Sequence, residues 1–345
     1  MSEPVAAKPL ILSSPAPRSI AMIFTDAAKS VLYDRYRLIE VDTDGLAALP
    51  DATLADVSYV LGQPPIPAEL LARLTGLKAV LNVESNLYPN MPYDLLFQRG
   101  IHVLTTGAVF AEPVAEIGLA FALNLFRDVV EADLAFREGR ELWGFEGNSR
   151  ARLLTGANVG LIGFGELGRA VNRVLAGFWP VIRVYDPWLP PSVIRDHHAT
   201  PAGLDEVLAS SDVVFCVASV TGENEGFLGA DHFARMNPGA AFILLSRAGV
   251  VDFDALVEAV RSGHILAASD VFPEEPLAAD HPVRGLKGFL RSAHRAGALD
   301  IAMKRMGDMV LEDMDLMDRG LPPLRCKRAE RETASKMRSR PVDKT

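Results

Sequence analysis

Short apolar segments alternate with helix-like segments along the first hundred residues of the chain. The pattern predicts strands at Ile20–Phe24, Arg37–Val41, Val57–Leu61, Ala79–Val83 and His102–Leu104. Helix-like stretches such as Pro67–Leu74 separate them, and this alternation is typical of a parallel sheet covered by helices. The proline-bearing segment before Ile20, with at most one short strand at Leu10–Leu12, is expected to be a loose leader.

Later patterns divide the chain into two domains. From Pro113 to about Glu138 the apolar spacing predicts one long helix, followed by a polar, glycine-bearing stretch. A second strand-and-helix series then runs to Ala293, and Asp300–Arg319 is helical in pattern and is expected to pack back on the first domain. A length of 345 residues favours two domains with a cleft between them. We therefore predict a substrate domain at 1–106 and 296–345, interrupted by a cofactor domain at 107–295.

Composition and charge narrow the possible partners. The formal net charge of −9 disfavours nucleic-acid binding, because phosphate contacts need a basic surface. Basic residues concentrate only after Gly320, where a solvated tail is favoured over a site for an anionic partner. Cys216 and Cys326, the only cysteines, are too few for a disulfide framework or a zinc site. With no secretory signal pattern and no stretch near the roughly 20 apolar residues that span a bilayer, we expect a soluble, cytoplasmic protein without metal, nucleic-acid or membrane partners.

A glycine-rich loop follows the expected strand 158–162. The loop reads Gly163-Phe164-Gly165-Glu166-Leu167-Gly168, and a helical pattern begins within it. Gly163 suits a tight turn, Gly165 a close approach to a pyrophosphate, and Gly168 close packing of helix on strand, while Glu166 and Leu167 open the helix whose free N–H groups face the phosphates. The next strand ends at Asp186, whose carboxylate can bind the ribose hydroxyls and would repel a 2′-phosphate. We therefore predict a dinucleotide site for NAD(H) in preference to NADP(H).

Three further strand ends carry groups suited to acid–base chemistry. Ser246 and Arg247 follow one strand, Asp270 and Glu275 follow the next, and His294 follows the third. The carboxyl ends of parallel strands meet at the ligand side of a doubly wound sheet, so these side chains are expected to converge.

In these motifs the chain resembles the D-isomer-specific 2-hydroxyacid dehydrogenase family, and its nearest general likeness is to D-glycerate, phosphoglycerate and hydroxypyruvate types. The resemblance spans roughly residues 75–320 and rests on the glycine loop with its acid, the segment 237–240 before Ser246-Arg247, the acidic run 270–276, and His294-Arg-Ala-Gly. It implies two doubly wound parallel-sheet domains, Rossmann-like or flavodoxin-like, a homodimer, and hydride transfer between NAD(H) and the alpha carbon of a small D-2-hydroxy or 2-keto acid.

The resemblance also implies a role for each matched residue. Arg247 would hold the substrate carboxylate and polarise the keto oxygen. His294 would exchange the hydroxyl proton, and Glu275 would orient this histidine and favour its protonated form. Ser246 and Asp270 would contact the cofactor, Asp270 near the nicotinamide carboxamide.

One segment departs from the family pattern. A glycine-rich loop whose N–H groups grip the substrate carboxylate usually follows the strand that corresponds to 79–83, but this chain has Glu84-Ser85-Asn86 there. A carboxylate at that place would repel a simple 2-keto acid. Either Glu84 binds a hydroxyl or amino group at the far end of the substrate, or it turns outward and leaves Ser85 and Asn86 to face the pocket.

Two other functions remain open from the sequence. The family also contains NAD(H)-sensing corepressors, for which the basic tail would be a partner surface. A related dehydrogenase of another small donor, such as phosphite, is also possible. Formate is disfavoured, because formate dehydrogenases of the family pair the histidine with an amide whereas Glu275 is an acid.

Overall fold

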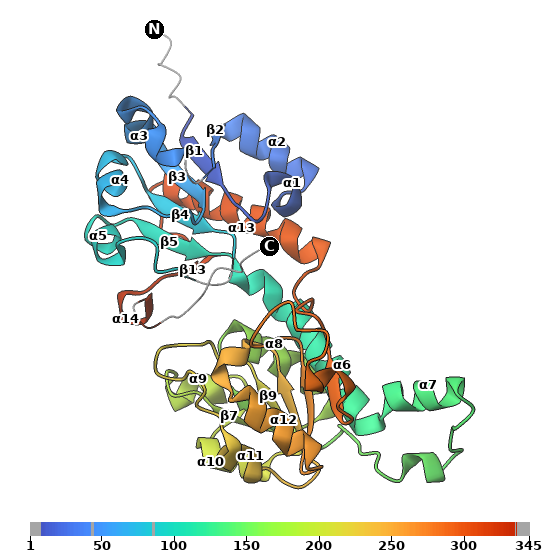
Figure 1. Ribbon diagram of the computed structural model, residues 1–345. Coiled ribbons are helices and arrows are strands. Elements are labelled where there is room, and N and C mark those ends of the chain that lie inside the picture. Colours follow the sequence, from blue (N-terminus) through green and yellow to red (C-terminus); the bar gives the residue numbers. More distant parts are fainter. Residues whose placement is uncertain (1–7, 43–44, 85–86, 335, 337–345) are drawn as a thin grey trace. The chain divides into compact units, whose positions relative to one another are not determined.

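The protein consists of two compact units, described here from a computed structural model that covers residues 8–42, 45–84, 87–334 and 336 (Figure 1). Unit 1 comprises Met1–Val109 and Leu299–Thr345, and unit 2 comprises Phe110–Ala298. The chain thus leaves unit 1 and returns to it once. Each unit is built on its own sheet, and the prediction of two doubly wound parallel-sheet domains is confirmed.

The sheet of unit 1 has the strand order β13-β5-β4-β3-β1-β2. All neighbours pair in parallel except β13, which pairs antiparallel with β5. The order reverses between β1 and β3, which is the topological switch point of this sheet. The strands are β1 (Leu10–Ser14), β2 (Arg37–Glu40), β3 (Val57–Gly62), β4 (Ala79–Asn82), β5 (His102–Thr105) and β13 (Lys327–Arg328).

The helices of unit 1 connect these strands and cover them. They are α1 (Ile20–Ile23), α2 (Asp26–Arg35), α3 (Asp51–Asp56), α4 (Ala68–Arg73), α5 (Tyr93–Gln98), α13 (Asp300–Asp318) and α14 (Arg331–Ala334). The last long helix, α13, belongs to unit 1, where it contacts α1 and α2. The buried carboxylate of Asp313 on α13 accepts hydrogen bonds from the N–H groups of Leu324, Arg325 and Cys326, which fixes the chain after the helix.

The N-terminal prediction is partly wrong. The short strand allowed at Leu10–Leu12 exists as β1, but it extends to Ser14, is buried, and pairs with β2 on one side and β3 on the other, so it is not part of a loose leader. Ile20–Ile23, expected to be a strand, is the helix α1, in which the Ser19 hydroxyl accepts a hydrogen bond from Met22 N–H. An apolar run of four residues does not distinguish a strand from one buried helical turn, and here the capping serine decides.

The sheet of unit 2 has the order β12-β11-β10-β9-β6-β7-β8 and every pair is parallel. Its switch point lies between β6 and β9. The strands are β6 (Asn158–Ile162), β7 (Val181–Tyr185), β8 (Thr200–Pro201), β9 (Val213–Cys216), β10 (Ala241–Leu244), β11 (Leu266–Ser269) and β12 (Phe289–Arg291), and the helices are α6 (Ala111–Arg127), α7 (Val129–Arg137), α8 (Glu166–Leu175), α9 (Pro191–Arg195), α10 (Leu204–Ser210), α11 (Ala230–Ala234) and α12 (Phe253–Arg261).

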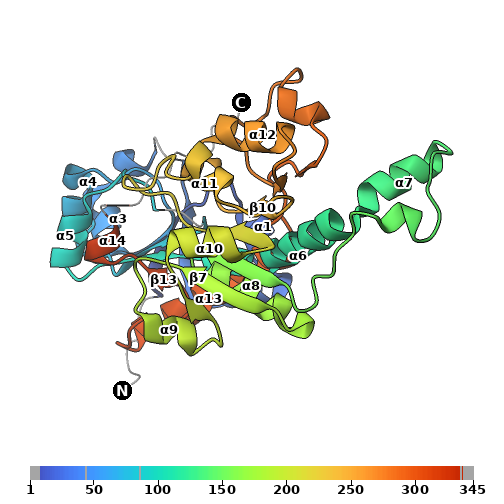
Figure 2. The ribbon, with the colours of Figure 1, turned by 90° about the horizontal axis from the view of Figure 1, so that it is seen from below.

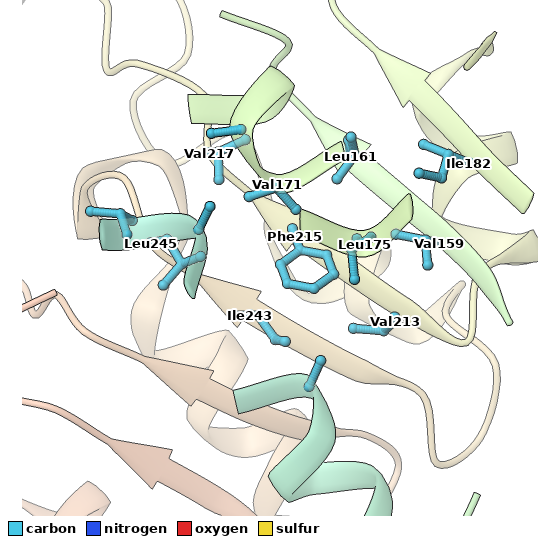
Figure 3. Packing of buried hydrophobic residues seen from close by; sticks show 14 of the residues in the cluster. Val159, Leu161, Val171, Leu175, Ile182, Val213, Phe215, Val217, Ile243 and Leu245 are labelled. Atoms are coloured by element: carbon cyan, nitrogen blue, oxygen red, sulfur yellow. The ribbon is translucent and has the colours of Figure 1, made fainter. Parts of the chain in front are cut away.

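Alternate residues of the central strands of unit 2 face opposite cores. Val213 and Phe215 belong to the cluster beneath α6 and α8, whereas Val214 and Cys216 belong to the cluster beneath α11 and α12. Figure 3 shows Phe215 beside Leu175 of α8. Because helices cover both faces, the central strands β9 and β10 are apolar and buried throughout, as expected for a buried parallel sheet.

The predicted helix 113–138 is two helices. α6 ends at Arg127, Asp128 has a left-handed φ of 53°, and α7 begins at Val129. Figures 1 and 2 both show α7 and the segment after it extending away from the sheet of unit 2. No residue of α7 is buried. The apolar periodicity continues across residue 128, so the pattern of apolar residues does not predict the break between the two helices.

The expectation that no stretch could span a bilayer is also wrong by length and composition. Gly107–Arg127, which includes α6, is long and apolar enough, and 44% of its 18-residue apolar window is buried in the structure. α6 contacts α8, β10 and β11, and its buried residues include Ala115, Ala122 and Phe126. A helix that packs on a sheet can be as long and as apolar as a membrane span, and packing explains the apolar character of α6.

Candidate active site

The glycine loop connects β6 to α8 with space for a ligand at its middle glycine. Gly163 has a φ of +93°, and a Cβ there would lie 2.7 Å from Ala218 Cα. A Cβ on Gly168 would lie 2.4 Å from the Gly163 carbonyl oxygen, so helix and turn pack at a distance that only glycine permits. At Gly165, by contrast, a Cβ would meet nothing within 4 Å. The open space lies at the N-cap of α8, where Glu166 and Leu167 begin a ten-residue helix.

Asp186 ends its strand beside this loop. One carboxylate oxygen accepts a hydrogen bond from Phe164 N–H at 2.8 Å, and the other accepts one from Trp188 N–H at 2.9 Å. The side chain remains partly exposed. The acid therefore fixes the turn, and each of its oxygens keeps further acceptor capacity. An open turn, a helix N-terminus and an acid at the next strand end together fit the phosphates and ribose of a dinucleotide.

Glu275 and His294 form an ion pair in unit 2. Nδ1 of His294 lies 2.5 Å from Oε2 of Glu275, and the two side chains are 36% and 30% exposed. Phe272 N–H donates to Oε1 of Glu275 at 2.9 Å. Burial raises the pKa of Glu275, but the hydrogen bonds from His294 and Phe272 and the charges of His294 and Arg247 outweigh it, so this pKa lies below its usual value of 4.5. The pair leaves Nε2 as the ring nitrogen available to a substrate.

Asp270 holds the loop that carries the histidine. His294 has a left-handed φ of 48°, and its N–H donates to the Asp270 carbonyl at 2.7 Å. The Asp270 carboxylate, 2% exposed, accepts from Arg295 N–H and Ala296 N–H, both at 3.0 Å. This positioning role of Asp270 was not predicted from the sequence. Its assignment of Asp270 to the nicotinamide carboxamide stays a prediction.

Arg247 follows β10 next to the same pair. Its Nη1 donates to the Ser246 carbonyl at 2.7 Å, and its charge contributes to the lowered pKa of Glu275. The hydroxyl of Ser246 is buried and has no hydrogen-bond partner among the described residues. Within unit 2 the structure therefore pairs Glu275 with His294 and places Arg247 near enough for its charge to lower the pKa of Glu275; these residues follow β10, β11 and β12.

In unit 1 Glu84 has a partner that the sequence analysis did not find. Nε of Arg18 lies 3.0 Å from Oε1 of Glu84, and Nη2 donates to Oε2 at 3.3 Å. Ser85 and Asn86 lie outside the described residues. Arg18 lies in the loop that follows β1. Its place at the edge of the sheet could be predicted only if Leu10–Ser14 were recognised as a core strand.

A dinucleotide loop, an acid at the next strand end and a histidine–carboxylate pair near an arginine define a nucleotide-dependent oxidoreductase site. Residues 119–296 match the model of the D-isomer specific 2-hydroxyacid dehydrogenase NAD-binding domain. The chain belongs to this family, and unit 2 contains its NAD-binding domain.

Relatives and solved structures support this assignment. D-3-phosphoglycerate dehydrogenase of Mycobacterium leprae is 31% identical over 79% of this chain and 50% of its own length. Glyoxylate reductase of Korarchaeum cryptofilum is 31% identical over 75% of this chain and 79% of its own length. The crystal structure of a phosphoglycerate oxidoreductase from Rhizobium etli is 63% identical, with a TM-score of 0.88, and the match covers 94% of this chain and 100% of that one. The chain spans about half the length of the phosphoglycerate dehydrogenase.

Proposed function

We propose that this protein is an NAD-dependent D-2-hydroxyacid dehydrogenase, which moves a hydride between nicotinamide and the alpha carbon of a small 2-hydroxy or 2-keto acid. The observation that carries the proposal is the 2.5 Å contact between His294 and Glu275 beside Arg247, on the sheet that bears the glycine loop. Family membership supports the same chemistry. Bound NAD(H) would supply or accept the hydride, which is the difficult part of the reaction.

The three side chains divide the remaining work. Arg247 holds the substrate carboxylate with its fork of donors and polarises the keto oxygen. His294 gives a proton from Nε2 to that oxygen during reduction and takes it back during oxidation. Glu275 accepts from Nδ1, which orients the ring and stabilises the imidazolium form.

The glycine loop and Asp186 support a preference for NAD(H). A carboxylate near the ribose accepts hydrogen bonds from two hydroxyls but repels a 2′-phosphate. The residues after Asp186 are Pro187, Trp188 and Leu189, which bring no positive charge. The preference remains a proposal, since a structural neighbour at 25% identity is described as an NADPH-dependent glyoxylate/hydroxypyruvate reductase.

The names of the relatives suggest which acids to try first. Their names give 3-phosphoglycerate or glyoxylate as substrates, and the solved structure that is 63% identical to this chain is a phosphoglycerate oxidoreductase. We infer a substrate of this size, with the alpha carbon and carboxylate in common. The cytoplasmic location inferred from the cysteine content fits Cys216 and Cys326, both buried and free.

A panel of 2-keto acids, followed by NADH absorbance, tests the function. Wild type should reduce at least one acid, and His294→Ala should lower kcat by about 10² to 10⁴-fold through loss of the proton carrier. Arg247→Ala should lower kcat/KM on every acid. The assignment fails if both variants keep wild-type turnover. Complete inactivity of the wild type, with retained NADH binding, would instead favour the sensing role.

We further propose a homodimer in which the segment from α7 to residue 153 contacts a second copy. Several of its large apolar side chains are more than half exposed: Val129, Phe136, Leu142, Trp143, Phe145 and Leu153. Exposed apolar side chains in this number, on a segment that leaves its own sheet, are typical of a protein interface. Replacing Trp143 and Phe145 together by Ser should shift the mass measured by sedimentation from dimer to monomer. A wild-type monomer would contradict the proposal.

A further inference from the structure

The loops after the parallel strands of unit 1 contain a single cationic residue. These loops are 15–19, 41–45, 63–67, 83–92 and 106, and Arg18 is the only Lys, Arg or His in their sequence. The same loops contain the acids Asp42, Asp44 and Glu84. Within these loops, Arg18 is therefore the residue that offers an opposite charge to an anionic group at the carboxyl edge of this sheet.

Arg18 also stands at the place where an open α/β sheet binds its ligands. It follows β1 by four residues, and β1 lies next to β3 at the switch point of the sheet. Connections leave such a point in opposite directions and open a crevice outside the strand ends. Glu84 follows β4 by two residues and reaches the same edge.

Glu84 positions Arg18 without occupying its whole guanidinium group. Oε1 and Oε2 of Glu84 face Nε and Nη2 of Arg18 at 3.0 and 3.3 Å. Glu84 is in turn tied to its strand, because its N–H donates to Oδ1 of Asn82 at 2.9 Å. Among the described residues no acceptor is recorded for Nη1 of Arg18, although the side chain is only 18% exposed. Guanidinium carries five donors, so one edge remains for a ligand.

The pairing sets what kind of ligand can bind. Glu84 balances one positive charge, which lets Arg18 sit mostly buried when no ligand is bound. It also weakens the attraction of Arg18 for any further group, so a hydroxyl gains little there. A phosphate, with its higher charge and three acceptor oxygens, gains most, and a carboxylate is intermediate.

We propose that Arg18, held by Glu84, binds a second anionic group of the substrate, distinct from the carboxylate beside the reacting carbon, and so selects 2-keto acids that carry a phosphate or a second carboxylate. The proposal rests on the proposed function. It also explains how a carboxylate can stand at this edge without repelling an anionic substrate: Glu84 is paired with Arg18, and Arg18 contacts the substrate.

Matched substrates measure the selection directly. With NADH we would compare 3-phosphohydroxypyruvate with hydroxypyruvate, and oxaloacetate with pyruvate, in wild type and in Arg18→Gln. The variant should lose about 10- to 100-fold in kcat/KM on the phosphorylated acid, mainly through KM, because one charged hydrogen bond is removed. In the double variant with Glu84→Gln, which removes the unpaired carboxylate, kcat/KM on hydroxypyruvate should change by less than about 3-fold. The oxaloacetate arm tells whether a carboxylate is accepted as well as a phosphate.

A double variant separates lost attraction from new repulsion, since Arg18→Gln also leaves Glu84 without its partner. In Arg18→Gln with Glu84→Gln no orphan carboxylate remains, and the preference for the phosphorylated acid should stay lost. Recovery of the wild-type preference would overturn the proposal, because the effect would then come from Glu84. Arg18→Lys should restore part of the preference, since it keeps the charge but not the fork.

Arg73→Gln is the matched control. Arg73 also belongs to unit 1 and its Nε lies 2.6 Å from Oδ1 of Asp51, in a pair between the end of α4 and the start of α3. It should leave the substrate ratio unchanged. A wild type that reduces 2-keto acids but keeps its ratio in Arg18→Gln refutes this inference alone, whereas a wild type that reduces none refutes the proposed function.

Discussion

Each unit of this protein holds a carboxylate at a strand end with a cation against it, and the two pairs are built for different work. In unit 1 the partner is Arg18, whose guanidinium offers only hydrogen-bond donors. In unit 2 the partner is His294, whose imidazole can donate or accept a proton. Glu84 and Glu275 are the same kind of group, each in a loop that follows a strand, so in our proposals the partner determines whether a pair recognises a substrate or moves a proton.

The largest expected effect comes from removing the acid of the second pair. Glu275→Gln should lower kcat on the order of 10²-fold on charged and uncharged substrates alike, because the amide no longer stabilises the imidazolium. Arg18→Gln, by contrast, should act on KM and only on charged substrates. Steady-state kinetics on the two substrate pairs distinguishes them. An equal loss on all substrates for both variants would show that the two pairs are not functionally distinct.

The same variant has a pH signature in stability. Because the pKa of Glu275 is held below 4.5 in the folded protein, its contribution to stability is complete above that value and is lost as the pH falls through the lower, folded pKa. Thermal unfolding between pH 3 and 7 should therefore show a smaller acid-side loss for Glu275→Gln than for wild type. Parallel curves would mean that the pair does not persist in solution.

A second, smaller effect concerns the cofactor. Asp186→Ser should raise the ratio of kcat/KM with NADPH to that with NADH on the order of 10-fold, since the repulsion of a 2′-phosphate is removed. The ratio is the useful measure, because Asp186 also fixes the glycine loop through Phe164 and Trp188. Asp205→Ser, at the start of α10, is the control and should not change it. If the NADPH-to-NADH ratio did not change in Asp186→Ser, Asp186 would not be the cause of a preference for NAD(H).

The third comparison uses two buried acids that hold loops, one in each unit. Asp270 accepts hydrogen bonds from two N–H groups and Asp313 from three. Substitution of either by Asn should reduce the free energy of unfolding by about 2 kcal/mol, because an amide leaves a buried donor unsatisfied. Only Asp270→Asn should also lower kcat severalfold, since its loop carries His294. Denaturant unfolding measures the free energy of unfolding, and steady-state kinetics on the same samples measures kcat. A lower kcat in Asp313→Asn would contradict the proposal that only Asp270 positions His294.

Much of unit 2 could be predicted because its evidence is local. The strand, glycine turn, helix and acid follow one another within thirty residues of sequence, from Asn158 to Asp186. The groups at the ends of β10, β11 and β12 could be expected to converge because parallel strands share one edge. What remained hidden was the use of Asp270, since nothing in its neighbours shows that its oxygens turn toward residues 295 and 296.

Unit 1 was harder to predict from the sequence than unit 2, because its evidence comes from residues that are far apart along the chain. The strand at Leu10–Ser14 is short and stands among prolines, so only its pairing on both sides shows that it belongs to the core. The pair of Arg18 and Glu84 joins residues 66 positions apart, and no spacing rule connects them. The break at Asp128 was equally invisible, because it depends on one residue with left-handed backbone.

From the sequence alone, the alternation of strands and helices, the order of the motifs and the identity of the acid–base groups could be determined, since these depend on periodicity and on near neighbours. The tertiary structure alone decided which acid meets which cation. From the sequence, the carboxylate of Glu84 was expected to repel an anionic substrate. In the structure Arg18, in the loop after β1, lies against it and balances its charge. The effect of a charge depends on the groups a few ångströms away in space rather than on its neighbours along the chain.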